Sequence, residues 1–144
     1  KKSPVKKKPS KNGGNPEDYK ILVVDDHPQT VVSITTVLDN EGFKTFQAYD
    51  GDEAIEIAKA EKPDLLICDI LMEGISGFDV AKVLPNQIMM FLTASEADEL
   101  RKKEDMEAVK FKNSLLILQK PVDTDKLLDV VRKLFHLPKR KTFW

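Results

Sequence analysis

The chain lacks most of the features that mark secreted and membrane proteins. Its 144 residues include a single cysteine, Cys68, which excludes an internal disulfide and favours a reducing compartment. No apolar run approaches the length that a membrane-spanning helix requires. The lysines near the amino terminus are not followed by the apolar segment of a secretory signal. We therefore expect a cytoplasmic protein, or the cytoplasmic piece of a larger one.

Acidic residues are also missing from positions 1–16, which carry six lysines. The whole chain has 23 basic and 24 acidic residues, so residues 17–144 hold 17 basic and 24 acidic ones, a net charge of −7. Val5 is the one large apolar side chain in positions 1–16, too little to form a packed core. We predict that residues 1–18 are a basic disordered tail or linker. A solvated linker is preferred to an arm that binds nucleic acid or anionic membrane.

Between residues 19 and 137, five short apolar runs alternate with segments of helical periodicity. This length suits one domain, followed by a short carboxyl-terminal tail at residues 138–144. Alternating strands and helices with short connections predict an α/β fold in which a five-stranded parallel sheet carries helices on both faces. The expected strands are residues 21–24, 43–48, 65–69, 88–92 and 115–118.

The expected helices have recognisable start signals and apolar faces. Pro28 suits the first turn of the first helix, and Asp52 is expected to cap the second. A short third helix would place Phe78 and Val83 in the core. A fourth, highly charged helix is expected over residues 95–111, where a capping box opens the segment.

One strand organises the rest of the chain, because the run from Leu65 is apolar at every position until it ends in Asp69. Such a run is typical of a strand that is buried on both faces. Right-handed crossovers put the carboxyl ends of parallel strands on one edge of the sheet, where open α/β sheets bind ligands. Polar residues that follow the predicted strands are therefore expected together at that edge: Asp25, Asp26, Asp69, Thr93 and Lys120.

Each of these residues alone has an ordinary structural explanation as a cap, a turn former or a loop residue. As a group, the three carboxylates repel one another, and a divalent cation such as Mg²⁺ would remove that cost. Asp69 would then be both a metal ligand and a nucleophile that attacks phosphorus to give an aspartyl phosphate. The Lys120 ammonium and the Thr93 hydroxyl would hold other phosphoryl oxygens.

Four motifs in the expected order carry a resemblance to a known family. They are VVDD at 23–26, CDILMEGISG at 68–77, LTAS at 92–95 and QKP at 119–121. With these motifs, residues 19–137 closely resemble the receiver domains of two-component response regulators. The resemblance implies a flavodoxin-like, doubly wound fold. It also implies that Asp69 accepts a phosphoryl group from a sensor histidine kinase or a phosphotransfer protein, and that phosphorylation switches partner interactions.

The resemblance assigns roles to individual positions. The implied Mg²⁺ ligands are Asp25, Asp26, Asp69 and the main-chain carbonyl of Leu71. Thr93 would be the switch hydroxyl that follows the phosphoryl group, and Lys120 would pair with that group. Members of the family often have a cis peptide bond after this lysine, so Lys120-Pro121 is expected to be cis.

The sequence departs from the family pattern in several places. Ile117 stands three residues before the conserved lysine, where receivers usually carry Tyr or Phe. The usual coupling of an aromatic ring to the switch hydroxyl therefore cannot operate in its normal form. Glu73 stands where the family usually has proline, and the short stretch from Asp69 to Thr93 predicts a trimmed third helix or loop.

A phosphoacceptor signalling domain, which assists only its own phosphorylation and dephosphorylation, is our leading interpretation. One alternative is a receiver-like interaction scaffold with atypical or no phosphorylation switching, which Ile117 favours. Another is a Mg²⁺-dependent phosphatase, but such enzymes need an acid two residues after the nucleophile, where this chain has Leu71. An output domain or downstream protein would lie outside these residues. Nucleic acid is not expected to bind this domain, and a homodimer is left open.

The two histidines and the cysteine have structural interpretations. His27 follows the Asp pair, and an exposed loop residue is preferred to a proton shuttle. His136 lies near the end of the last helix, where a cation suits the helix dipole. Cys68 is expected to be a small buried side chain.

Overall fold

A computed structural model describes residues 13–93 and 114–139 of the chain. These residues form a sheet of five parallel strands in the order β2-β1-β3-β4-β5. The strands are β1 Lys20–Val24, β2 Lys44–Ala48, β3 Leu65–Asp69, β4 Met89–Thr93 and β5 Ser114–Gln119. The described α-helices are α1 Pro28–Asn40, α2 Gly51–Glu61, α3 Gly77–Val83 and α5 Thr124–Leu134. The predicted fold class is confirmed, while the helix expected at 95–111 lies outside the described residues.

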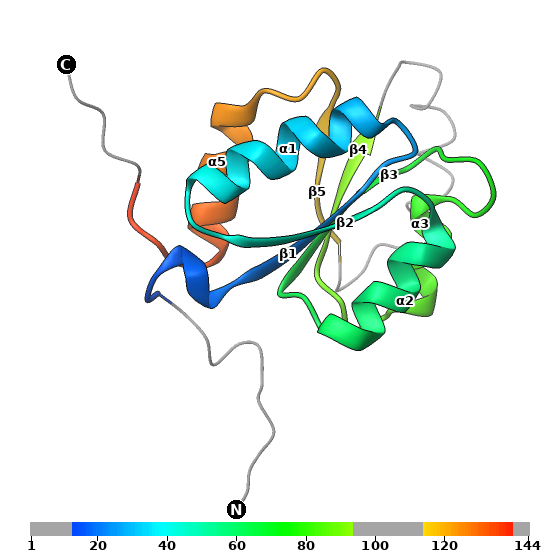
Figure 1. Ribbon diagram of the computed structural model, residues 1–144, viewed down its shortest axis with the longest axis horizontal. Coiled ribbons are helices and arrows are strands. Elements are labelled where there is room, and N and C mark those ends of the chain that lie inside the picture. The colour runs from blue at the N-terminus through cyan, green and yellow to red at the C-terminus, as the bar shows by residue number, and fades with distance from the viewer. Residues whose placement is uncertain (1–12, 94–113, 140–144) are drawn as a thin grey trace, which may run out of the picture.

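The helices cover the two faces of the sheet in pairs, α1 with α5 and α2 with α3 (Figure 1). Side chains of β1 alternate between the two layers. Ile21 and Val23 belong to the core cluster with α1 and α5, whereas Leu22 and Val24 belong to the cluster with α2 and α3. Every residue of β3 is buried, because this strand lies in the middle of the sheet between both layers. This position explains its unbroken apolar run.

The strand order creates a switch point between β1 and β3. After β1 the chain adds β2 at one edge, then returns to β3 and continues outward through β4 and β5. In open α/β sheets, the loops that follow the two strands at such a point diverge and leave a crevice for a ligand. Asp25 follows β1 and Asp69 ends β3, so both acids lie at this crevice.

The first helix, α1, begins where its residues predict. Pro28 occupies the first turn, where an N–H group has no partner inside the helix. Val31, Ile34 and Leu38 recur at helical spacing and are buried against the sheet. Gly42 follows the helix with a φ of 103°, a conformation that glycine adopts without strain.

Two predictions about helix residues are wrong. The cap of α2 is Asp50, whose carboxylate accepts a hydrogen bond from the Glu53 N–H at 2.8 Å, and Asp52 lies inside the first turn. Val83 is 49% exposed instead of buried. Five residues turn an α-helix by about 140° around its axis. Val83 is therefore on the solvent side of α3 when Phe78 is on the core side.

The ordered part of the chain begins before Tyr19, although the sequence predicted that it begins at this residue. The 3-10 helix η2 Pro16–Asp18 precedes β1, and the Gly13 N–H donates to the carbonyl of Phe135 at 2.8 Å. Tyr19 stacks on Phe135 with ring centroids 4.1 Å apart. The prediction of a disordered tail is therefore wrong for residues 13–18. Backbone hydrogen bonds join these residues to one another and to the end of α5, and these bonds hold the segment in place.

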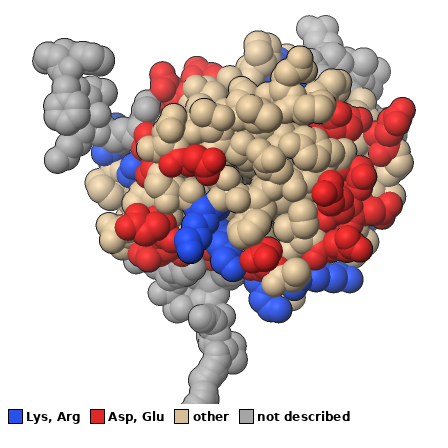
Figure 2. Space-filling model, in the orientation of Figure 1, with Lys and Arg blue, Asp and Glu red and all other residues tan. Residues whose placement is uncertain are grey.

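The face of the molecule in Figure 2 shows where its acidic side chains gather. Red acidic groups are concentrated over the region where α2 begins, with fewer blue basic groups around them. Asp52 and Glu53 lie in the first turn of α2, where negative charge stabilises a helix through its dipole. Among the described helices, none is long and apolar enough to cross a membrane.

Candidate functional site

The register of the central strands brings two acids side by side. Val24 of β1 is the partner of Cys68 of β3, so the next residues, Asp25 and Asp69, emerge next to each other. Both acids are buried, Asp25 with 0% and Asp69 with 2% of its surface exposed. A carboxylate is rarely buried to this extent unless a cation or hydrogen bonds compensate.

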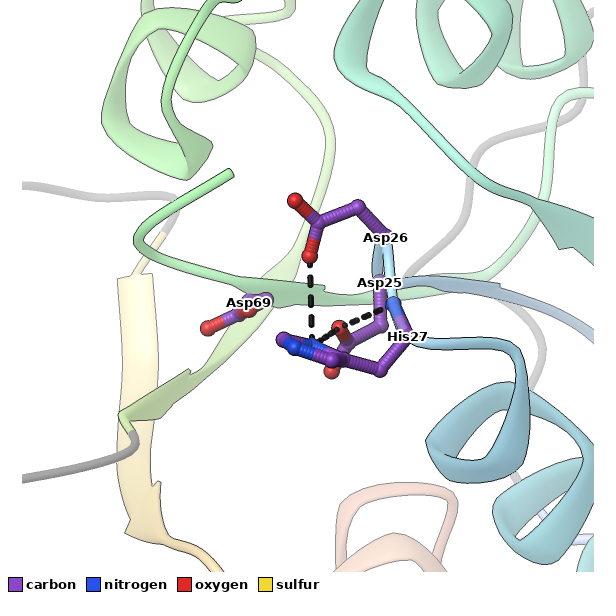
Figure 3. Close-up of side chains that lie close together, drawn as sticks. All are labelled: Asp25, Asp26, His27 and Asp69. Atoms are coloured by element: carbon purple, nitrogen blue, oxygen red, sulfur yellow. Dashed lines mark hydrogen bonds and ion pairs between the residues drawn. The ribbon is translucent and has the colours of Figure 1, made fainter. Parts of the chain in front are cut away.

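The turn after β1 adds a second carboxylate and an imidazole to this pair. The Asp25 Oδ1 atom accepts the His27 N–H at 2.9 Å. The His27 ring turns back over the acids, with Nδ1 3.0 Å from Asp25 Oδ1 and 3.2 Å from Asp26 Oδ1 (Figure 3). Its side chain is 65% exposed, so the expectation of an exposed residue holds. The contact with both acids was missed, since residue type alone does not fix a rotamer.

The cation that faces the buried pair is Lys120, which follows β5. Its Nζ lies 2.6 Å from Asp25 Oδ2 and 3.2 Å from Asp69 Oδ2. Burial lowers the pKa of Lys120, but hydrogen bonds and charge attraction from both acids outweigh this effect and raise it. Lys120 is therefore a firmly held ammonium that bridges two carboxylates. The Lys120-Pro121 bond is cis, as the resemblance predicted.

Thr93 occupies the end of β4, beside the strand that ends in Asp69. Only 2% of the surface of Thr93 is exposed, and its main-chain carbonyl accepts a hydrogen bond from the Lys120 N–H at 2.8 Å. Leu92, the residue before it, is the sheet partner of Asp69. The structure thus places Thr93 at the same edge as the acids and joins it by backbone to Lys120.

Asp69 has the most perturbed environment of the described acids. Burial, and then the neighbouring Asp25 carboxylate, raises the pKa of Asp69 from 3.8 to about 6, against the opposing effect of Lys120. Its Oδ1 atom is buried and has no hydrogen-bond partner within residues 13–93 and 114–139. This arrangement leaves one carboxylate oxygen ready for a cation or an electrophile.

The donors around Asp69 fit a divalent cation. Four residues each offer one ligand atom, and these four atoms lie within 4.8 Å of one another: Asp25, Asp26, His27 and Asp69. Hard carboxylate oxygens are the ligands that Mg²⁺ prefers, and an unpartnered buried oxygen is the group that such an ion would satisfy. The sequence predicted the three acids of this group.

The loop after β3 closes over the acids. Asp26 Oδ2 accepts the Glu73 N–H at 3.1 Å, which ties this loop to the turn after β1. The Gly77 N–H donates to the Ile70 carbonyl at 2.8 Å, so α3 starts directly against the end of β3. Leu71 is 37% exposed, and the role of its carbonyl as a metal ligand stays a prediction.

Cys68 is buried directly before the acid. Its Sγ donates to the Asp69 carbonyl at 3.4 Å. Burial, followed by the charges of Asp69 and Asp25, raises the pKa of the Cys68 thiol well above its usual value. Because the thiolate is the nucleophilic form, Cys68 is an inert packing residue, as the sequence predicted.

The described residues form a doubly wound parallel sheet with buried acids and a lysine at its carboxyl edge, which defines an α/β domain that binds ligands at its switch point. Residues 21–132 match the family model of the response regulator receiver domain. The chain belongs to this family, and it is a receiver domain of the kind found in two-component response regulators. The predicted family is confirmed, and with it the function of a receiver domain, while the acceptor residue and the phosphoryl donor stay predictions.

Individual relatives agree with this membership. The chain is 31% identical over 123 residues to sporulation initiation phosphotransferase F of Bacillus subtilis, which covers 82% of this chain and 94% of the relative. It is 39% identical over 83 residues to the alkaline phosphatase synthesis transcriptional regulatory protein PhoP of the same species, 55% of this chain and 35% of that protein. The chain therefore spans nearly the full length of one relative and about a third of the other.

Solved structures give the same result. The response regulator TrrA from Thermotoga maritima, in complex with Mg²⁺-BeF, superposes with a TM-score of 0.67 at 31% identity, covering 81% of this chain and 98% of that one. The chemotaxis protein CheY4 of Vibrio cholerae superposes with a TM-score of 0.70 at 26% identity, covering 80% and 97% of the two chains. Both solved structures thus share the fold of this chain, and one of them holds Mg²⁺-BeF.

Proposed function

We propose that Asp69 is the phosphoacceptor of this chain and that it receives a phosphoryl group from a phosphohistidine on a sensor histidine kinase or phosphotransfer protein. The observation that carries the proposal is the state of its carboxylate. Oδ2 is held by Lys120 at 3.2 Å, while Oδ1 is buried without a partner among the described residues. The carboxylate thus has two oxygens in different surroundings, so it can bind a cation through one and attack phosphorus with the other.

In the transfer, an oxygen of Asp69 forms a bond to phosphorus while the bond between phosphorus and the donor imidazole nitrogen breaks. The departing nitrogen keeps the electron pair of the broken bond, and the product is an aspartyl phosphate. Such reactions need positioning and neutralisation of charge more than covalent help from the protein. Lys120 is placed to neutralise a phosphoryl oxygen, because its Nζ already lies between Asp25 and Asp69. The Thr93 hydroxyl would hold another.

We assign the Mg²⁺ site to Asp25, Asp26 and Asp69, with the Leu71 carbonyl as a further ligand. When bound, Mg²⁺ supplies positive charge that offsets the phosphoryl oxygens. The Asp26 carboxylate is suited to this role because its side chain is 27% exposed and reaches the rim of the pocket. The Glu73 N–H that it accepts holds it toward the loop after β3.

The readout of phosphorylation in this chain would not use an aromatic switch. Ile117 packs against the core cluster of α2 and α3, in the position where receivers usually have Tyr or Phe. We propose that residues 19–137 form the signalling unit, with a tail at 138–144, and that it acts in the cytoplasm. It would assist only its own phosphorylation and dephosphorylation. Its output would come through a domain or protein outside these residues.

The test is incubation of the full chain with acetyl phosphate and Mg²⁺, followed by intact-mass measurement. The native chain should gain one phosphoryl group, and Asp69→Asn should gain none. Asp129→Asn removes an exposed acid of α5 and should behave like the native chain. If the native chain gains nothing although it binds Mg²⁺, the receiver-like scaffold replaces the phosphoacceptor as the function.

A further inference from the structure

His27 is the one side chain of the acidic site to which the proposed function gives no role. It is the residue before α1 and makes no side-chain cap for that helix. Its ring could extend into solvent, yet Nδ1 faces two carboxylate oxygens from the same turn. A nitrogen donor in this position changes the chemistry of the site.

The two distances from the imidazole nitrogen to these carboxylate oxygens match those within a coordination shell. Nδ1 of His27 lies 3.0 Å from Asp25 Oδ1 and 3.2 Å from Asp26 Oδ1. Ligand atoms about 2.0–2.1 Å from a Zn²⁺ ion lie about 3.0 Å apart in an octahedral shell and about 3.3 Å apart in a tetrahedral one. The imidazole nitrogen is therefore spaced from each carboxylate oxygen as two neighbouring ligands of such an ion would be.

A second, independent observation points to a ligand at this place. Only 2% of the surface of Asp69 is exposed, and its Oδ1 atom has no hydrogen-bond partner in the described parts of the chain. Its ligand atom lies within 4.8 Å of those of Asp25, Asp26 and His27. A cation near His27 would give this orphaned oxygen the partner that a buried polar atom requires.

The donor set now decides which cation fits. Carboxylate and carbonyl oxygens suit Mg²⁺, whereas imidazole suits zinc, copper, nickel and iron. We propose that His27 makes this pocket a mixed nitrogen and oxygen site, which binds a borderline divalent metal of the zinc type through His27 Nδ1 and the Asp carboxylates, in competition with Mg²⁺. The inference rests on the proposed phosphoryl-transfer pocket for its location. Because both ions use oxygens of Asp25 and Asp26, the zinc-bound chain would exclude the Mg²⁺ that phosphorylation needs.

The experiment compares two histidine variants in the full chain, with Zn²⁺ and Mg²⁺ as separate titrants in isothermal calorimetry. His27→Asn removes the nitrogen donor, and asparagine suits the residue that precedes a helix. His136→Asn is the matched control, because His136 is exposed at the other end of the chain with a φ of 59°, which asparagine tolerates. Loss of His27 should weaken Zn²⁺ binding at least about tenfold. Its Mg²⁺ affinity should stay within about threefold of the native value, because Mg²⁺ uses oxygen ligands.

A spectroscopic readout separates ligation from a mere change of local charge. The Nδ1 resonance of His27 in nitrogen-15 spectra of the native chain should shift much further on addition of Zn²⁺, which binds this nitrogen, than on addition of Mg²⁺, which acts on it only through the Asp25 and Asp26 carboxylates. The His136 resonances should respond to neither ion. Unchanged Zn²⁺ affinity in His27→Asn, or an unmoved Nδ1 resonance, would overturn the inference.

The two proposals fail in different arms of this experiment. If the native chain does not bind Mg²⁺, the Mg²⁺-dependent phosphoacceptor function is wrong, whatever Zn²⁺ does. If Mg²⁺ binds and Zn²⁺ binding is independent of His27, the acidic site stands and His27 is a surface residue. Retained Mg²⁺ affinity in His27→Asn also shows that the variant is folded.

Discussion

Asp69 combines burial with a neighbouring like charge, and this combination is costly in the absence of a metal. Its exposed fraction is 2%, and Asp25 lies beside it at the ends of paired strands. The Lys120 ammonium offsets part of the cost, but the pKa of Asp69 is still raised to about 6. The group that is proposed to do the chemistry is therefore also a source of instability.

Asp69→Asn should stabilise the metal-free protein at neutral pH. Because the folded-state pKa of about 6 exceeds the ordinary 3.8, the native state binds more protons between these values, and stability falls as pH rises through this window. A shift of about two pH units corresponds to about 3 kcal/mol, at about 1.4 kcal/mol per unit. Urea denaturation of both proteins from pH 3.5 to 7.5 measures the difference.

The stability difference should be close to zero near pH 3.5 and reach its full value above pH 6. Addition of Mg²⁺ should stabilise the native chain more than the variant, which lacks one carboxylate ligand, since a ligand that binds the folded state raises its stability. Parallel pH curves for the two proteins would show that Asp69 is not perturbed as described.

Residue types predicted much of the site but not its contacts. Asp25, Asp26, Asp69 and Lys120 were recognised because polar residues at the ends of buried strands stand out against their apolar neighbours. The approach of His27 to two of these acids could not be predicted. A side chain at the start of a helix has several allowed rotamers, and its choice depends on neighbours that only the folded chain supplies.

At the scale of elements, the approach of α3 to the end of β3 positions the acceptor. Gly77 begins α3, and a Cβ added there would overlap the Asp69 carbonyl oxygen and lie 3.1 Å from Ile70 Cα. Both neighbours are backbone atoms, so neither can swing aside. Only glycine permits this contact without moving the strand that ends in Asp69.

Gly77→Ala should therefore destabilise the fold by about 1–3 kcal/mol through overpacking, and weaken Mg²⁺ binding by displacing Asp69. The matched control is Gly74→Ala in the same loop. Gly74 has a φ of 85° and open space around it, so the change costs about 1 kcal/mol of backbone strain and should leave Mg²⁺ affinity nearly unchanged. Denaturation curves and Mg²⁺ titrations of the two variants check this. Equal loss of Mg²⁺ affinity in both would contradict the role of the close approach.

The start of α2 offers a direct comparison between two neighbouring acids. Asp50 accepts a hydrogen bond from the Glu53 N–H, whereas Asp52 contributes only its charge within the first turn. Asp50→Ala should lower the free energy of unfolding by about 1 kcal/mol. Asp52→Ala should lower it by less than about 0.5 kcal/mol. Thermal denaturation of the two variants measures both losses of stability. A larger loss in Asp52→Ala than in Asp50→Ala would show that Asp52 is the cap.

Strands were easier to predict than helix ends, for a physical reason. A strand buried on both faces must be apolar throughout, as β3 is, and few other segments can satisfy that pattern. A cap, by contrast, depends on which of two nearby acids meets the free N–H groups, and Asp50 and Asp52 are chemically identical. Val83 was misplaced because one apolar residue at a short helix does not determine which side faces the core.

At the scale of the whole molecule, the strand order assembles the site. Asp25, Asp69 and Lys120 come from segments far apart in the chain, and the order β2-β1-β3-β4-β5 brings their strand ends to one edge. Parallel alternation predicted this convergence, and the family resemblance implied a flavodoxin-like, doubly wound sheet. The readout beyond the site, where Ile117 replaces an aromatic residue, depends on partners that the chain's own pattern does not describe.

The proposed phosphorylation of Asp69 in the folded receiver can be tested at the level of one residue. The native chain is incubated with acetyl phosphate and Mg²⁺, reduced with borohydride, which converts an aspartyl phosphate to homoserine, and digested for peptide mapping. Homoserine is expected at position 69 alone, with none when Mg²⁺ is chelated and none in Asp69→Asn. Homoserine at another acid, or at position 69 without Mg²⁺, would contradict the proposal.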